Sequence, residues 1–76
     1  MKRIKAEDIA LAKAVRRIRI KNGVSQIWMA GLLGISSQQM HKYEVGKDRL
    51  PATYLKKISN ALKVGINEFF YDDENK

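Results

Sequence analysis

A run of uncharged hydrogen-bonding side chains stands in the middle of a chain that is otherwise rich in charge. Residues 34–47 read "GISSQQMHKYEVGK", with two serines and two glutamines ahead of the first lysine. A glutamine amide holds donors and an acceptor side by side, so it can pair with both N6 and N7 of adenine, and a serine hydroxyl can serve either kind of base. Such side chains are suited to reading a surface of paired donors and acceptors, whereas clustered lysines would mainly hold phosphate.

These side chains need a rigid element to present them, and the sequence around them predicts a short helix. Ser36 is a typical N-cap residue, and Gln39, three residues later, completes a capping-box pattern. The helix is expected to run to about Glu44, and Gly46 is expected to end it. The uncharged run therefore forms the first turn of this helix.

Helical geometry decides which side chains of this helix are exposed. At about 100° per residue, Met40 and Tyr43 define the inward side. The opposite side then carries Gln38, His41 and Lys42 and, less squarely, Ser37. Lys42 lies one turn beyond Gln38, from where it can reach guanine or phosphate.

Apolar spacing and turn residues predict four more helices, and no stretch alternates with period two for long enough to form a strand. The five helices cover about residues 6–21, 26–33, 37–44, 51–62 and 66–70, and the expected fold class is all-α. The last helix is expected to bring Phe69 and Phe70 to the core. The second and third helices are joined by "GIS", which is the spacing of a helix-turn-helix whose second helix enters the major groove.

The stretch "GVSQIWMAGLLGISSQQMHKYEVGK" resembles the helix-turn-helix of the lambdoid phage repressor and Cro family, also called XRE-type regulators. The resemblance extends from about residue 11 to residue 70, and "ISNALKVGINEFF" is similar to the fourth and fifth helices of the family. It implies a compact five-helix, lambda-repressor-like DNA-binding domain over residues 1–71, with the helix-turn-helix itself at about 25–45. Residues 72–76 would then form a short acidic tail.

The resemblance also implies contacts with double-stranded DNA. The eight side chains concerned are Gln26, Ser37, Gln38, Gln39, His41, Lys42, Lys47 and Arg49. Ser37, Gln38 and Lys42 would face bases, and Gln26, at the start of the second helix, would bond a phosphate. Lys47 and Arg49 lie in the loop after the third helix and would touch the backbone or the minor groove.

The other two of the eight residues are Gln39 and His41. Gln39 is open between its capping role and a contact with DNA. His41 is expected to be exposed, near phosphate or solvent. As the only histidine in a chain without cysteine, it cannot build a metal site from several imidazoles.

Glu44 is a lone carboxylate in the middle of the chain, and the resemblance implies that it pairs with Arg19 and ties the first helix to the third. That role would be structural. The other acids are scattered, and no nucleophile stands beside a base and an orienting group, so we expect neither an enzyme nor a cofactor.

The charge of the chain points to a polyanionic partner. Among its 76 residues, 15 are lysine or arginine and 8 are aspartate or glutamate, for a net charge of +7. Three of the acids fall in residues 72–76, so the excess on the rest is larger, and such an excess attracts nucleic acid. No apolar run approaches the ~20 residues that span a bilayer, and no signal peptide is apparent, so a cytoplasmic protein is expected.

The second helix departs from the resemblance on its outer face. The family usually has polar or acidic residues at the positions of Ile27 and Trp28. Helical spacing groups these with Gly31 and Leu32 into an outward face without charge. We expect this face either to bind a second subunit or another protein, such as RNA polymerase or an antagonist, or to fold back through Trp28 onto Ile20.

The function expected from the sequence is a sequence-specific, double-stranded DNA-binding transcriptional regulator from a bacterium or phage. Repression by a dimer on a palindromic operator fits best, although activation is also compatible. The alternative from another class is an antitoxin or adaptor that uses the same fold to hold a partner protein. A small RNA-binding protein fits the charge, but the chain offers few surface aromatics and no strand platform for stacking bases.

Overall fold

The computed structural model describes residues 4–70, which form four α-helices and one 3-10 helix without a strand in that range. The elements are α1 (Ala6–Lys21), α2 (Gln26–Leu33), α3 (Ser37–Glu44), α4 (Ala52–Leu62) and the 3-10 helix η1 (Ile66–Phe70). The expected all-α class is confirmed. The acidic tail at 72–76 lies outside the described residues.

The short fifth helix expected at about 66–70 is present as a 3-10 helix. Its Glu68 N–H donates to the carbonyl oxygen of Gly65 at 2.9 Å, three residues back. Five residues are too few to build a ladder of i to i−4 bonds, so the tighter turn satisfies the backbone sooner.

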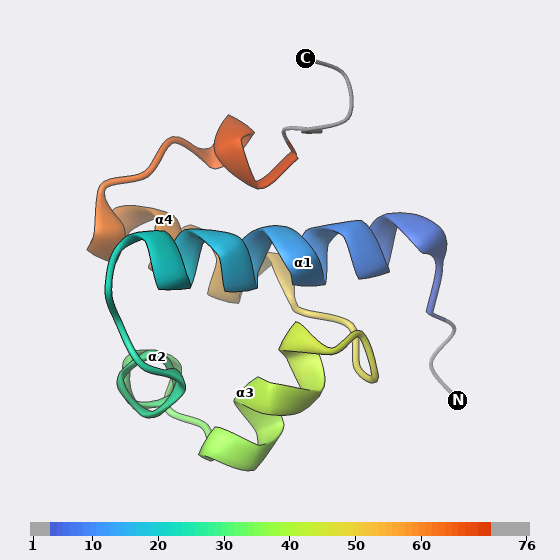
Figure 1. Ribbon diagram of the computed structural model, residues 1–76, viewed down its shortest axis with the longest axis horizontal. Coiled ribbons are helices and arrows are strands. Elements are labelled where there is room, and N and C mark those ends of the chain that lie inside the picture. The colour runs from blue at the N-terminus through green and yellow to red at the C-terminus, as the bar shows by residue number, and fades with distance from the viewer. Residues whose placement is uncertain (1–3, 71–76) are drawn as a thin grey trace.

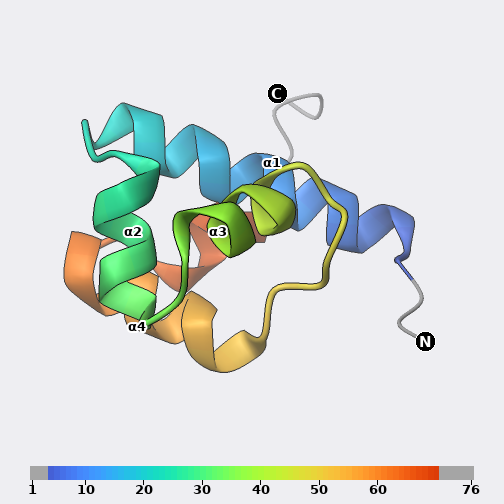
Figure 2. The same cartoon turned by 90° about the horizontal axis from the view of Figure 1, so that it is seen from below.

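The long helix α1 is the central element of the molecule. The 3-10 helix η1 lies on one side of it, and α2 and α3 lie on the other, with α4 behind (Figure 1). Seen from below, α2 and α3 lie towards the viewer with their short connection between them (Figure 2). The helix-turn-helix pair therefore forms one face of the molecule, and α1, α4 and η1 support it.

One fully buried side chain from each element meets in a single core. These are Val15, Met29, Met40, Ile58 and Phe69. Burying an aliphatic or aromatic side chain of this size contributes about 1.5–3 kcal/mol. Because α2 and α3 are each only eight residues long and would not be stable alone, this shared core holds them in place.

Phe70 does not enter the core as the sequence suggested. It is 65% exposed, whereas Phe69 is 2% exposed. In a 3-10 helix, with about three residues per turn, consecutive side chains point to well-separated directions, so only one of two neighbours can face α1. The Arg17 Nη2 also donates to the Glu68 carbonyl oxygen at 3.3 Å, which fixes the turn against α1.

Candidate nucleic-acid interface

The turn between α2 and α3 is set by local backbone bonds. Gly34 ends α2 in the left-handed region, at φ 71° and ψ 33°. The Ile35 N–H donates to the Ala30 carbonyl oxygen at 3.0 Å, and the Gly34 N–H donates to Gly31 at 3.3 Å, which is the Schellman pattern of helix ends. Glycine suits this position because a Cβ would strain a positive φ.

Serine caps start both helices of the pair. The Trp28 N–H donates to Ser25 Oγ at 2.9 Å, and the Gln39 N–H donates to Ser36 Oγ at 3.1 Å. Each cap satisfies one of the backbone donors that a helix start leaves unpaired. The two serine caps and the Gly34 turn therefore set the direction of α3 relative to α2, through bonds that all lie within residues 25–39.

The side chains predicted to read bases lie on the surface of α3. Met40 and Tyr43 are buried, and Tyr43 also packs edge-on against Tyr54 of α4, with ring centroids 6.1 Å apart. The opposite face therefore exposes Gln38, His41 and Lys42, and Ser37 lies half-buried beside them. This arrangement brings an amide, an imidazole and an ammonium group onto one accessible helix face.

Gln39 does not close the capping box that the sequence suggested. Its side-chain Nε2 instead donates to Asp48 Oδ2 at 2.9 Å. The acceptor in this bond is a carboxylate, and a hydrogen bond to a charged group is stronger than the neutral bond that a capping box would add. Gln39 therefore ties the start of α3 to the loop that carries Lys47 and Arg49.

The same loop has a second tether at Arg49. Its Nε lies 3.4 Å from Asp8 Oδ1 at the start of α1, and its guanidinium stays about half exposed. Lys47 is exposed, and its backbone N–H donates to the Lys42 carbonyl oxygen at 2.9 Å. The predicted backbone-contacting residues thus sit on a loop whose position relative to α3 is restrained.

Arg19 and Glu44 form a buried ion pair between α1 and α3. Arg19 Nε lies 2.7 Å from Glu44 Oε2, and Arg19 Nη2 lies 3.1 Å from Glu44 Oε1. Arg19 Nη1 donates to the Val24 carbonyl oxygen at 2.8 Å. With two parallel bonds to the carboxylate, this pair has the geometry in which arginine binds most strongly.

Sequence reasoning missed a second partner of Glu44. Gln26, the first residue of α2, donates from its Nε2 to Glu44 Oε1 at 3.0 Å. The two residues are 18 positions apart, and nothing in their spacing indicates a contact. Gln26 is half-buried at the start of α2, so the side chain predicted to bond a phosphate is also held by a hydrogen bond inside the protein.

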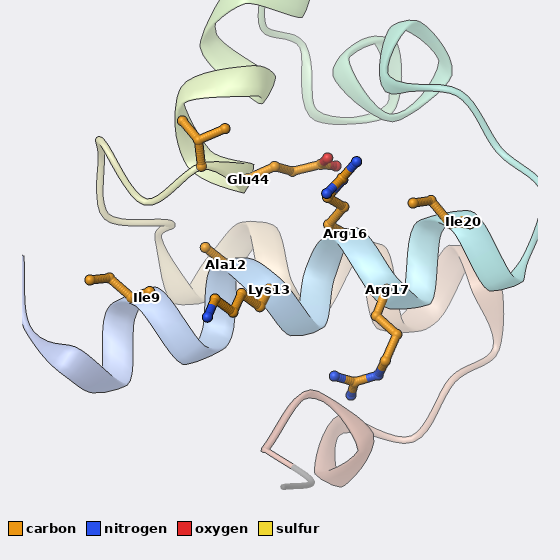
Figure 3. A pocket seen from close by; sticks show the side chains of 8 residues that line it. Ile9, Ala12, Lys13, Arg16, Arg17, Ile20 and Glu44 are labelled. Atoms are coloured by element: carbon orange, nitrogen blue, oxygen red, sulfur yellow. The ribbon is translucent and has the colours of Figure 1, made fainter. Parts of the chain in front are cut away.

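A shallow cleft opens between α1 and the end of α3. Its apolar lining comes from Ile9, Ala12, Ile20 and Val45, and its basic lining from Lys13, Arg16 and Arg17. Arg16 reaches from α1 towards Glu44 across this cleft (Figure 3). Positive charge thus continues along α1 beside the buried ion pair.

Comparison with known proteins agrees with this geometry. A family model described as helix-turn-helix matches residues 15–69, which include α2, the turn and α3. The chain belongs to the helix-turn-helix family. The resemblance to XRE-type regulators in the sequence is thereby confirmed.

Curated relatives of this helix-turn-helix chain come from several bacteria. An uncharacterized HTH-type transcriptional regulator, y4wC of Sinorhizobium fredii, is 38% identical over 71 residues, which is 93% of this chain and 50% of the relative. A regulator of the same description from Sinorhizobium medicae is 40% identical over 65 residues, 86% of this chain and 47% of the relative. The chain thus spans about half the length of these relatives.

Solved structures share the fold. The restriction-modification controller protein C.AhdI from Aeromonas hydrophila aligns with a TM-score of 0.75 at 24% identity, over 87% of this chain and all of that one. The clp gene regulator ClgR from C. glutamicum aligns with a TM-score of 0.78 at 21% identity, over 87% of this chain and 86% of that one. The predicted lambda-repressor-like arrangement is confirmed at the level of the fold.

The outer face of α2 differs in part from the expectation. Ile27 is 74% exposed, Trp28 is 45% exposed, and Gly31 opens to solvent. Leu32 is half-buried and packs against the core, so it does not belong to the exposed face. The reason is that α2 packs against both α3 and α4, which leaves a narrower outward strip than one neighbouring helix would.

The exposed surface of the helix-turn-helix carries basic side chains and no acidic one. Across α2 and α3 the only acidic residue is Glu44, which is buried against Arg19. The exposed part of these two helices therefore carries no negative charge, while Lys42 and Lys47 flank the polar face of α3. Within residues 4–70, no group of three potential metal ligands gathers, and no helix combines the length and apolarity needed to cross a bilayer.

Proposed function

We propose that this chain is a sequence-specific, double-stranded DNA-binding transcriptional regulator. The observation that carries the proposal is the exposed face of α3, where Gln38, His41 and Lys42 project from a helix held by the buried Met40 and Tyr43. The uncharged start of the face suits hydrogen bonding to base edges, and the lysines suit phosphate. The exposed surface of α2 and α3 has no acidic side chain that would repel a polyanion such as DNA.

Size argues that two copies act together. A recognition helix of eight residues reaches only a few base pairs, which is too few to specify one site. We therefore infer a homodimer on a palindromic operator, with repression following from occupation of a promoter. The protein would work in the cytoplasm, by binding and without catalysis.

Selection of binding sites from a random duplex library tests this function. The expected outcome is a two-fold symmetric motif whose half-sites lie about 10 base pairs apart. Recovery of no symmetric motif, or equal affinity for unrelated duplexes at moderate salt in gel shifts, would exclude a dimeric reader of sequence.

Substitutions at Gln38 and Lys47 are expected to weaken DNA binding in different ways. Gln38→Ala should cost about 1–3 kcal/mol on the selected duplex and relax preference at one base position. Lys47→Ala should weaken all duplexes alike and lower the salt slope by about one, because one phosphate contact is lost. Titrations of cognate and scrambled duplexes at several salt concentrations measure both quantities.

Lys56→Ala is the matched control for this comparison, since it removes the same charge from an exposed position on α4. A uniform loss for Gln38→Ala on cognate and scrambled DNA would contradict base reading by Gln38.

A second candidate function rests on the exposed Ile27 and Trp28. Neighbouring exposed apolar side chains are typical of interaction sites, and tryptophan is enriched at the centres of protein interfaces. An antitoxin or adaptor that holds a partner protein through α2 would use this strip. RNA polymerase or an antagonist protein are partners of the same kind.

Trp28→Glu is expected to separate this surface from the core. Trp28 is 45% exposed and its backbone stays capped by Ser25, so helical content and melting temperature should change little. If the strip is an interface, self-association or partner binding should fall at least ten-fold, as for an interface hot spot. Circular dichroism and sedimentation measure the two outcomes, with Ala61→Glu on α4 as the control for added charge. If the folded Trp28→Glu protein associates as the native chain does, the strip is not an interface.

A further inference from the structure

Glu44 takes part in more than an ion pair between two helices. Its side chain is fully buried, and it accepts three hydrogen bonds, two from Arg19 and one from Gln26. Oε2 receives Arg19 Nε, and Oε1 receives both Arg19 Nη2 and Gln26 Nε2. A carboxylate removed from water depends on such donors, and hydrogen bonds to a charged group are stronger than those between neutral groups.

This bond fixes one end of the Gln26 side chain. A glutamine side chain is flexible and loses conformational freedom when it is ordered. Gln26 is the first residue of α2, and its amide has two N–H groups, of which Glu44 takes one. Because the amide is planar, holding one N–H also sets the direction of the second N–H and of the carbonyl oxygen.

The position of Gln26 at the start of α2 makes the orientation of its amide relevant to the binding of an anion. The start of a helix attracts anions, and α2 begins on the face of the molecule that carries α3 (Figure 2). A carboxylate close to a DNA phosphate would repel it, but Arg19 balances the charge of Glu44, whose side chain is fully buried, whereas the neutral Gln26 is half-buried. The pair can therefore hold Gln26 without presenting a negative charge to DNA.

We propose that Glu44 is a positioning residue for DNA binding: it holds the amide of Gln26 so that the second N–H is already aimed at a backbone phosphate. The inference rests on the proposed function for its phosphate, but the contact between Glu44 and Gln26 is a property of the free protein. Preorganisation of one flexible side chain saves the cost of ordering it on binding, which corresponds to about three- to ten-fold in affinity.

The first experiment observes the contact without DNA. In the ¹⁵N-labelled full chain, the side-chain N–H signals of Gln26 should exchange slowly with water and lie apart from those of the exposed Gln38. In Glu44→Gln, or in Glu44→Asp if the first variant unfolds, the Gln26 signals should move to values like those of Gln38. If Gln26 already behaves like Gln38 in the native chain, the proposal is overturned, whether or not the protein binds DNA.

The second experiment is a double-mutant cycle in DNA affinity, on the duplex that site selection recovers. Gln26→Ala and Glu44→Gln should each weaken binding about three- to ten-fold, and the double variant should be no weaker than Gln26→Ala alone. Glu7→Gln is the control, since it removes the same charge from an exposed position on α1. Because Gln26 is neutral, the salt slope should stay that of the native chain.

The cycle also separates positioning from a merely structural role. If Glu44→Gln acted only through stability, its loss in affinity would persist unchanged in the Gln26→Ala background, and the proposal would fail. If no duplex is selected at all, the proposed function fails, and the amide signals still decide whether Glu44 holds Gln26.

Discussion

Replacement of Arg19 by methionine is expected to cost about 3–5 kcal/mol of stability, because it leaves the carboxylate of Glu44 buried without its charged partner. The Glu44 side chain is fully buried and that of Arg19 nearly so, with bonds of 2.7 and 3.1 Å between them. A domain has a total stability of roughly 5–15 kcal/mol, so the variant should lose a large part of it and melt at a clearly lower temperature.

The paired replacement is the informative comparison. Glu44→Gln removes the charge that Arg19→Met strands, so the double variant should be more stable than the sum of the two losses implies. Denaturation in urea followed by circular dichroism measures all three variants. Strictly additive losses would mean that the two side chains do not act as a pair in solution.

A more exposed ion pair of the same protein, Arg49 with the partly buried Asp8, provides the control. Arg49→Met breaks the contact with Asp8, in which the arginine is about half exposed and the distance is 3.4 Å. Exposed pairs contribute about 0–1 kcal/mol, so this variant should unfold close to the native chain. The difference between the two arginines isolates the effect of burial.

Phe69→Ala is expected to cost about 3–5 kcal/mol, whereas Phe70→Ala should change stability by less than about 0.5 kcal/mol. The two residues are adjacent and chemically identical, but one is 2% and the other 65% exposed. Phe69 belongs to the same buried cluster as Val15 and Ile58, and η1 contacts both α1 and α4, so its removal leaves a cavity under η1.

Thermal and urea denaturation of the two variants measure this difference directly. Similar losses for both would show that Phe69 is not the buried and Phe70 not the exposed side chain of η1. A loss of stability confined to Phe70→Ala would mean that Phe70, and not Phe69, is the buried side chain.

Local signals in the sequence were enough for the helices and for the turn between α2 and α3. Ser25 and Ser36 cap the helices that follow them, and Gly34 ends α2 in the left-handed region. Each of these features depends on bonds between residues within about five positions of one another, so the residue types alone indicate them. The exposed face of α3 follows from the same kind of reasoning, because Met40 and Tyr43 are one turn apart.

Predictions that depended on which neighbour a side chain meets were less successful. Leu32 and Phe70 are both apolar and both lie at the edge of a helical face, where burial depends on the neighbouring elements. Leu32 packs against the core because α2 lies against both α3 and α4, and the 3-10 geometry of η1 turns Phe70 outward. Helical periodicity places a residue on a face, but it does not say how wide the covered part of that face is.

The sequence by itself determined an all-α, basic, helix-turn-helix chain with an uncharged start to its third helix. Only the tertiary structure decided the partners of the polar side chains: Gln39 with Asp48, and Gln26 with Glu44. These contacts span 9 and 18 residues, and each polar side chain has several partners that spacing would allow. In both contacts the glutamine donates to a carboxylate. A charged oxygen that is shielded from water binds strongly to the donors that the packed helices bring within reach.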